Sequence, residues 1–242
     1  MSSTSSSKPL AALTSYVVDC IDLGSDLTRL VATREVGAVE GAIFYATRIT
    51  EALAHHTLNQ MGLAPSFNLY SNLLLLESYG LMTTHQLYWG HAMRWLGNDV
   101  RHLRRRVNER DMLMSLALLE RILHWFFTED RIVLSSPAAD SPQSVMYDLC
   151  PDRHLCDVME TLDRPLDAAG LKSLDRSLLM DESSLAAVYS EHLIAADRLR
   201  DALEILEQAL TLFPENLRLR QLRALGWSRE GRLDAAREEL EA

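Results

Sequence analysis

The last third of this chain repeats itself at an offset of 34 residues. The segment DRLRDALEILEQAL begins at Asp197, and the segment GRLDAAREELEA begins at Gly231. The matched positions hold identical residues in four pairs: Arg198 and Arg232, Leu199 and Leu233, Ala202 and Ala236, Leu206 and Leu240. A fixed period of roughly 20–50 residues is typical of stacked units that bury their apolar sides against one another. The repeat therefore predicts an array of helical hairpins.

The period and its pattern resemble the tetratricopeptide repeat, a helix–turn–helix unit. Trp227, Gly231 and Ala236 match the aromatic, turn-glycine and small-residue positions of that repeat. The resemblance implies tetratricopeptide-like repeats over residues 149–242, the first copy degenerate and the last incomplete. It also implies a protein partner bound by the repeats.

A fainter copy lies a further 34 residues upstream, where DRPLDAAG occupies residues 163–170. About three repeats are needed before such a stack is stable, so a degenerate first copy is physically reasonable. The same offset aligns Cys156 with Ser190 and Ala224, a position for small residues. We therefore expect Cys156 to be a packed core residue.

Charge and cysteine usage limit the function of the chain. The formal net charge is −10, so the molecule as a whole should repel nucleic acid and anionic membranes. Its three cysteines cannot all pair, which favours a reducing compartment. No apolar run approaches the roughly 18 residues that span a membrane, and residues 1–9 lack the apolar run of a signal peptide. We expect a cytoplasmic protein with a disordered tail over residues 1–9 and no membrane contact.

Ahead of the repeats, apolar residues at helical spacing predict five helices, over residues 9–33, 36–61, 67–79, 84–107 and 109–128. Gly62 and Gly80 should end the second and third of these helices. No segment alternates like a strand, so no sheet is expected. The Ser/Pro-rich segment at 135–144 predicts a linker over residues 131–148. The fold class is therefore all-α, with a helical bundle over residues 10–130.

The fourth predicted helix separates its apolar and polar residues. At about 100° per residue, Trp89, Met93 and Leu96 should face the core. The opposite face collects groups that bind phosphate, accept protons or donate in fixed geometry, namely His91, Arg94, Asn98, Arg101 and His102. A glycine in a helix interior costs about 1 kcal/mol, so Gly97 indicates close approach by another backbone and motivates the prediction of a dimer. A solvated face remains the alternative interpretation of the polar set.

Three segments of this bundle resemble the bacterial domain-of-unknown-function family 4145. They are RITEAL (48–53), LESYGLMT (76–83) and MRWLGNDVRH (93–102). That family shows an arginine about one turn before a glutamate, and later an Arg-x-x-Gly-Asn-x-x-x-His segment. Here Arg48 and Glu51 supply the first pattern and are expected to form an ion pair. The family is similar to the HEPN superfamily of four- or five-helix bundles.

Many HEPN proteins are metal-independent RNases that act as dimers. By that similarity His102 would take the 2′-hydroxyl proton, Arg94 would stabilise charge on the phosphate, and Asn98 would orient the phosphate or the imidazole. Residues that would help to bind the substrate are His91, Arg101, Arg104 and Arg105. The spacing departs from the superfamily motif, because seven residues separate Arg94 from His102 and a tryptophan follows the arginine.

Two functions of different class therefore stay open. One is an interaction or adaptor protein that forms a homodimer through the bundle and binds a protein partner through the repeats. The other is a metal-independent endoribonuclease in defence or stress response, with RNA as its substrate. The net charge favours the first, and the collected polar face favours the second. The group Cys150, His154 and Cys156 lacks a second pair of metal ligands, and no phosphate-binding glycine loop or nucleophile elbow occurs, so no metal and no cofactor are expected.

Overall fold

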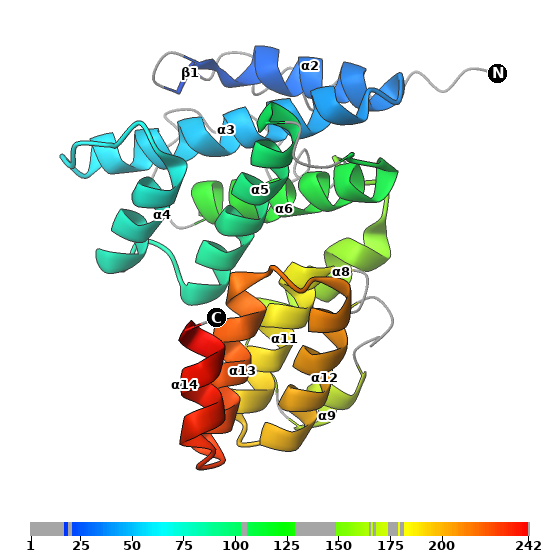
Figure 1. Cartoon of the computed structure of the whole chain (residues 1–242). Helices are drawn as coiled ribbons and strands as arrows, with labels where there is room; N and C mark the ends of the chain where they lie inside the picture. The colour runs from blue at the N-terminus through cyan, green and yellow to red at the C-terminus, as the bar shows by residue number, and fades with distance from the viewer. Residues whose placement is uncertain are drawn as a thin grey trace. The chain divides into compact units, whose positions relative to one another are not determined.

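The computed structural model describes residues 17–18, 21–102, 106–128, 149–164, 166, 168–173, 179 and 182–241. The chain divides into two compact units, Met1–Cys156 and Asp157–Ala242. Apart from one short two-stranded ladder, the regular structure of the described residues is helical, so the chain is all-α as predicted (Figure 1). The predicted tail over residues 1–9 and the predicted linker over residues 131–148 lie outside the described residues.

The first unit is organised around a central helix. Its long helices are α2 Leu23–Glu35, α3 Val39–Gln60, α4 Leu69–Ser78, α5 Thr84–His102 and α6 Glu109–Thr128. Helix α3 packs against α2 on one side and against α5 and α6 on the other (Figure 1). The predicted helices over residues 36–61, 67–79 and 109–128 are confirmed to within three residues at each end.

The first predicted helix, over residues 9–33, is wrong over part of its length. Strand β1 Val17–Val18 pairs antiparallel with strand β2 Ile21–Asp22, and α2 begins only at Leu23. Three of these four strand residues are β-branched, and such side chains favour extended backbone. The expectation of no strand pairing is therefore corrected at this short ladder.

Local sequence fixes both ends of the segment that leads into α5. Helix α4 ends at Ser78, and the predicted terminator Gly80 follows two residues later with a φ of +66°. The Leu81 N–H donates to the Leu76 carbonyl at 2.7 Å. Helix α5 then begins at a capping box. The Thr83 N–H donates to Gln86 Oε1 at 2.8 Å, and the Gln86 N–H donates to Thr83 Oγ1 at 3.3 Å.

The second unit consists of helix pairs. The boundary between the units falls within helix α8 Arg153–Leu162, so the second unit begins with the end of this helix. The helices that follow are α9 Ala168–Ser173, α11 Ser183–Ala195, α12 Leu199–Leu212, α13 Leu217–Arg229 and α14 Leu233–Glu241. Helix α13 begins 34 residues after α11, and α14 begins 34 residues after α12. The 34-residue repeat of the sequence is therefore a repeat of the structure.

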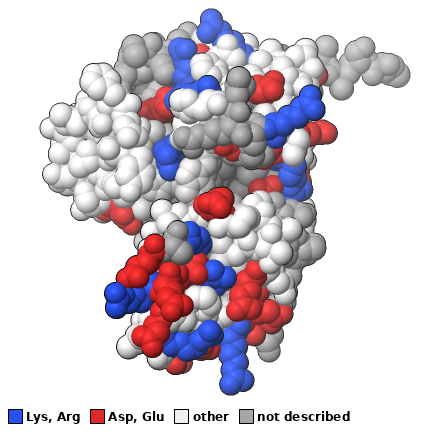
Figure 2. Space-filling view, viewed as in Figure 1, with Lys and Arg blue, Asp and Glu red and all other residues white. Residues whose placement is uncertain are grey.

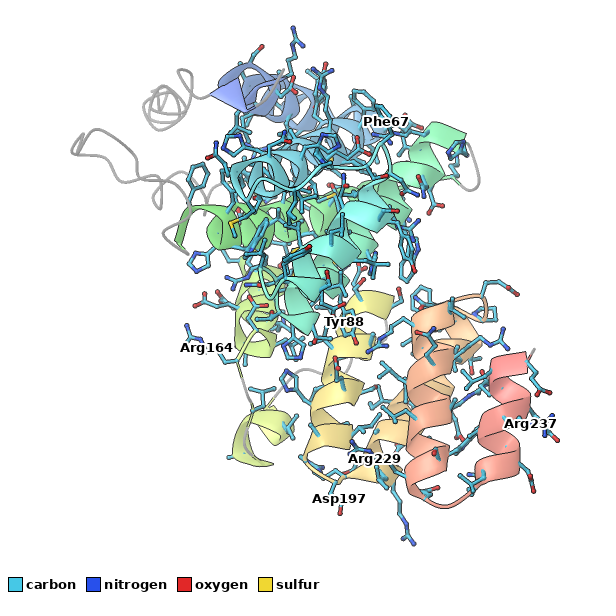
Figure 3. All side chains as sticks on the ribbon, turned by 90° about the vertical axis from the view of Figure 1, so that its left-hand side faces the viewer. Phe67, Tyr88, Arg164, Asp197, Arg229 and Arg237 are labelled. Atoms are coloured by element: carbon cyan, nitrogen blue, oxygen red, sulfur yellow. The ribbon has the colours of Figure 1, made fainter. Side chains whose placement is uncertain are left out.

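The turns of the two helix pairs match as well. Asp197 and Gly231 occupy the same position and both have positive φ, +58° and +83°. In each turn the next residue donates its N–H to a carbonyl five residues earlier, at 2.8 Å in both pairs. Asp197 lies at the same end of the unit as Arg229, whose guanidinium donates to the Ile194 carbonyl at 3.0 Å (Figure 3).

The small-residue position predicted from the repeat is confirmed. Cys156, Ser190 and Ala224 are all buried, although the first belongs to the first unit and the others to the second. The matched alanines Ala202 and Ala236 are buried too. Small side chains at these positions allow neighbouring helices to approach closely.

Candidate functional site

Helix α5 crosses α3 at Gly97. A Cβ atom at this glycine would lie 2.5 Å from both Oγ1 and Cγ2 of Thr47. Thr47 is buried, and its hydroxyl donates to the Ile43 carbonyl at 2.9 Å. The close approach predicted at Gly97 therefore occurs within the chain. This glycine gives no support to a dimer, which stays a prediction on other grounds.

The apolar face of α5 is placed as predicted. Trp89, Met93 and Leu96 are buried against the other helices of the bundle, and Gly90 and Gly97 are buried beside them. The polar face points away from this core, and most of its residues are half-buried. The separation of the two faces fixes the direction in which the candidate side chains leave the helix.

Arg94 and His91 lie against Tyr70 of α4. The Arg94 guanidinium carbon is 5.3 Å from the Tyr70 ring centroid and 5.9 Å from that of Trp95, both within cation–π range. The His91 and Tyr70 ring centroids are 5.3 Å apart. Burial, and secondly the charge of Arg94, lower the pKa of His91 to about 4. His91 is therefore neutral at pH 7 and adds no positive charge for a phosphate.

Arg101 is held by a carboxylate of α3. Its Nη1 and Nη2 donate to Oε1 and Oε2 of Glu51 at 2.8 and 2.9 Å. This bidentate pair raises the pKa of Arg101, mainly through the hydrogen bonds from the guanidinium to Glu51. The predicted substrate-binding arginine is thus already compensated by one negative charge within the bundle.

The expected ion pair between Arg48 and Glu51 is replaced by contacts to two other helices. Arg48 Nε lies 2.8 Å from Oδ2 of Asp26 on α2, while Glu51 binds Arg101 on α5. Asp26 is only 2% exposed, so the arginine supplies the charge that a buried carboxylate needs. The Arg-Glu pattern of α3 therefore ties three helices together.

The remaining predicted site residues are spread along α5. Asn98 is half-buried, and His102 is exposed in the last turn. Arg94 and His102 are eight residues apart on one helix, which places their Cα atoms about 12 Å apart along its axis. Arg104 and Arg105 lie outside the described residues. Sharing one face in projection therefore does not bring Arg94 and His102 to one point within a single chain.

A buried carboxylate in α6 was not identified from the sequence. Glu120 accepts hydrogen bonds from the Cys150 N–H and from Arg153 Nη2, both at 2.8 Å, and from Cys156 Sγ at 3.3 Å. The hydrogen bond between the two thiols lowers the pKa of Cys150 and raises that of Cys156. Through its hydrogen bonds to Cys150 and Arg153, Glu120 holds the start of α8 against α6. Among the described residues, no group of three or more His, Cys, Asp or Glu is placed to hold a metal ion.

Two exposed apolar surfaces also escaped the sequence analysis. On the first unit, Phe67 just ahead of α4 and Tyr70 and Leu74 within that helix are exposed. On the second, a groove of about 590 Å³ runs along α13 and α14. Its apolar lining consists of Ala224, Leu225, Leu233, Ala236 and Leu240. Helical periodicity could have indicated both, but it does not show whether another helix covers them.

Comparison with known proteins bears on the first unit. The family model described as "Domain of unknown function (DUF4145)" matches residues 29–141. This range includes the three segments on which the resemblance was based, so the match supports that family. No curated protein and no solved structure matches the chain. No helix in the described part of the chain is both long and apolar enough to cross a membrane.

Proposed function

We propose that this chain is an adaptor protein in which tetratricopeptide-like repeats bind a protein partner. The observation that carries the proposal is the exposed apolar groove along α13 and α14. The identical 34-residue spacing of both helix pairs supports the tetratricopeptide-like assignment, as does the shared positive φ at Asp197 and Gly231. Such repeats use stacked helices to present extended binding surfaces.

The bundle supplies the HEPN-like scaffold of this adaptor. Its order of helices α2 to α6 and the family match over residues 29–141 support this assignment. We propose that it also forms the homodimer, with Phe67, Tyr70 and Leu74 at the contact between copies. Large apolar side chains that are exposed together are typical of interaction sites. Arg94, which contacts Tyr70, adds a residue type that is enriched at interfaces.

The alternative function is a metal-independent endoribonuclease. The exposed His102 favours it, because a general base must reach its substrate. Three observations weigh against it: Arg101 is paired with Glu51, Arg94 lies over the Tyr70 ring, and His91 is neutral at pH 7. The positive charge that a phosphate would require is therefore largely engaged within the bundle.

The two functions are separated by one pair of measurements on the full chain. We expect no cleavage of single-stranded RNA in EDTA, either by the wild type or by the His102→Ala variant. Photo-cross-linking amino acids are placed, one at a time and in cells, at Gln208, Gln221 and Arg237. At least one of these positions should capture one protein reproducibly. RNA cleavage that is lost in His102→Ala, together with no captured protein, would overturn the adaptor proposal.

Self-association needs its own measurement. Sedimentation equilibrium at tens of micromolar should give a dimer, and Leu74→Glu should convert it to a monomer with unchanged helicity. The matched control is Val36→Glu, because Val36 is an exposed apolar residue elsewhere on the same unit. A wild-type monomer at this concentration would contradict dimerisation through the bundle.

A further inference from the structure

Two cysteines meet at the start of α8. Cys150 and Cys156 are both buried, and both have free thiols. The Asp152 carbonyl accepts a hydrogen bond from Cys150 Sγ at 3.7 Å and one from the Cys156 N–H at 3.2 Å. One carbonyl thus holds both residues at the same turn, and their thiols are hydrogen-bonded to each other. The proposed adaptor function makes no use of this pair.

Hydrogen bonds fix the short segment between the two cysteines. Asp152 caps α8, because its Oδ1 accepts from the Leu155 N–H at 3.0 Å. Cys150 Sγ also donates to the Leu113 carbonyl of α6 at 3.5 Å. A disulfide requires that the two sulfur atoms approach to about 2.0 Å. Thiols that already form a hydrogen bond need only a local rearrangement to reach it.

The two thiols differ in how readily they lose a proton. The hydrogen bond from Cys156 lowers the pKa of Cys150, and the charge of Arg153 lowers it further. The same hydrogen bond, together with burial, raises the pKa of Cys156. Because the thiolate is the nucleophilic form of cysteine, Cys150 is the residue that attacks first. Cys156 remains a thiol until a base removes its proton.

That base is present in α6. Cys156 Sγ donates to Glu120 Oε2 at 3.3 Å. The other oxygen, Oε1, accepts from the Cys150 N–H and from Arg153 Nη2, both at 2.8 Å. Oε1 thus anchors the carboxylate, and Oε2 is left to take the proton of the Cys156 thiol. A carboxylate within hydrogen-bond reach of the proton that it removes can act as a general base.

We infer that Cys150 and Cys156 are an oxidation site at which hydrogen peroxide forms a reversible disulfide. The Cys150 thiolate attacks one peroxide oxygen, the O–O bond breaks, and the departing hydroxide takes up the proton that the thiol had lost. Glu120 then removes the proton of Cys156, whose sulfur attacks the sulfenic acid on Cys150. The S–O bond breaks, and Glu120 returns the proton to the departing hydroxide. Two thiols and one peroxide thus give one disulfide and two water molecules.

Burial and charge select a small, neutral oxidant. Cys150 is 1% exposed and Cys156 is 9% exposed, so a disulfide of the size of oxidised glutathione does not reach either sulfur in the folded chain. The net charge is −10, and acidic side chains gather over α14 on the face shown in Figure 2. A negative surface repels anionic oxidants such as oxidised glutathione. Hydrogen peroxide is uncharged and little larger than a water molecule.

Peptide mapping of the full chain tests the pair. A Cys20→Ser background leaves only these two cysteines. Trypsin cleaves after Arg153, so the disulfide joins the peptides 132–153 and 154–172, and dithiothreitol separates them. Hydrogen peroxide should produce the joined peptides from a chain that still runs as one copy in non-reducing electrophoresis. Oxidised glutathione should attach to neither cysteine of the folded chain.

Two single variants identify the order of attack. Cys156→Ala should fold, because the repeat places Ala224 at the matching buried position, and peroxide should then leave a sulfenic acid on Cys150 that dimedone traps. Cys150→Ala should leave Cys156 unlabelled under the same exposure. Circular dichroism should show wild-type helicity in both. Absence of the joined peptides in the Cys20→Ser chain, or glutathione on either cysteine, would overturn the inference.

Glu120→Gln tests the base. Glutamine keeps the shape and the anchoring oxygen but accepts no proton, so formation of the joined peptides should slow about tenfold or more. Dimedone labelling of Cys150 in the Cys156→Ala background should not slow, because the lost negative charge favours the thiolate. The matched control is Glu160→Gln, since Glu160 of α8 pairs with Arg164 instead, and it should change neither rate. Equal rates of disulfide formation in Glu120→Gln and wild type would remove Glu120 from the reaction.

Discussion

Replacing Gly97 by alanine should destabilise the first unit although alanine is the better helix former. The new Cβ atom would lie 2.5 Å from two atoms of Thr47 and 3.0 Å from its Cβ atom. Rotating χ1 of Thr47 would relieve only one of the short contacts, because the side chain branches at Cβ. Overpacking of this kind costs about 1–3 kcal/mol, and the helix propensity of alanine returns about 1 kcal/mol. Taking about 2 kcal/mol for the overpacking and subtracting about 1 kcal/mol for the helix propensity, we expect a net loss of about 1 kcal/mol in the free energy of unfolding.

Urea unfolding followed by tryptophan fluorescence measures this loss. Three of the four tryptophans, Trp89, Trp95 and Trp125, belong to the first unit, so a Trp227→Phe background makes the signal specific to that unit. A signal confined to one unit allows that unit's transition to be fitted as two-state even where the two units unfold separately. The Gly97→Ala variant should have a lower urea midpoint with an unchanged slope.

A double-mutant cycle identifies the cause. Thr47→Ala removes both atoms at 2.5 Å, so the double variant should recover most of the stability lost in Gly97→Ala. Thr47→Ala alone should cost about 1 kcal/mol through the lost hydroxyl hydrogen bond. An unchanged midpoint in Gly97→Ala, accompanied by weaker self-association, would refute this reasoning and assign the glycine to an interface between copies.

Three further predictions concern residues with well-defined contacts. Asp197→Gly should stabilise the second unit by about 0.5–1 kcal/mol in thermal unfolding, because glycine adopts a φ of +58° without strain. Gly231→Ala should destabilise the same unit, and a change in stability of the same sign in both variants would contradict the shared turn geometry. Folded His91 resists protonation down to a pKa of about 4, whereas the unfolded chain binds the proton near its ordinary value of 6.5. Stability should therefore fall as pH is lowered from 6.5 to 4, and this part of the fall should be absent from urea midpoints of His91→Gln. Arg48→Ala removes the closer of the two arginines at the buried Asp26 and leaves Arg29, whose Nη1 is 3.7 Å from Oδ1. It should lower the free energy of unfolding by about 1–3 kcal/mol, and an unchanged urea midpoint would contradict this role of Arg48.

The repeats and the ends of the bundle helices could be predicted because their causes are local. Gly80 and Gly231 take positive φ, a conformation for which glycine is suited irrespective of the rest of the fold. The 34-residue repeat can be recognised by aligning two segments of the sequence, without knowledge of the fold. The ladder at Val17 and Ile21 was missed because the apolar residues there fit helical spacing and strand pairing equally well.

The contacts of the candidate site could not be predicted, because they join distant parts of the chain. Arg101 and Glu51 are 50 residues apart, and nothing in either segment specifies the other until α5 crosses α3. The contact between Arg94 and Tyr70 likewise depends on how α4 packs beside α5. A helical projection gives the direction of a side chain, but it gives neither its partner nor its distance along the axis.

The equal spacing of the two helix pairs makes the outer surface of the second unit independent of the number of repeats. Each pair covers the face of the pair before it and presents an equivalent face of its own, as Leu206 and Leu240 do. Such an array has translational symmetry, so inserting a further 34-residue copy would move the outer face along without changing it. Recognition at that face is then a property of the repeating pattern, and the length of the array can vary while the surface is regenerated at each step.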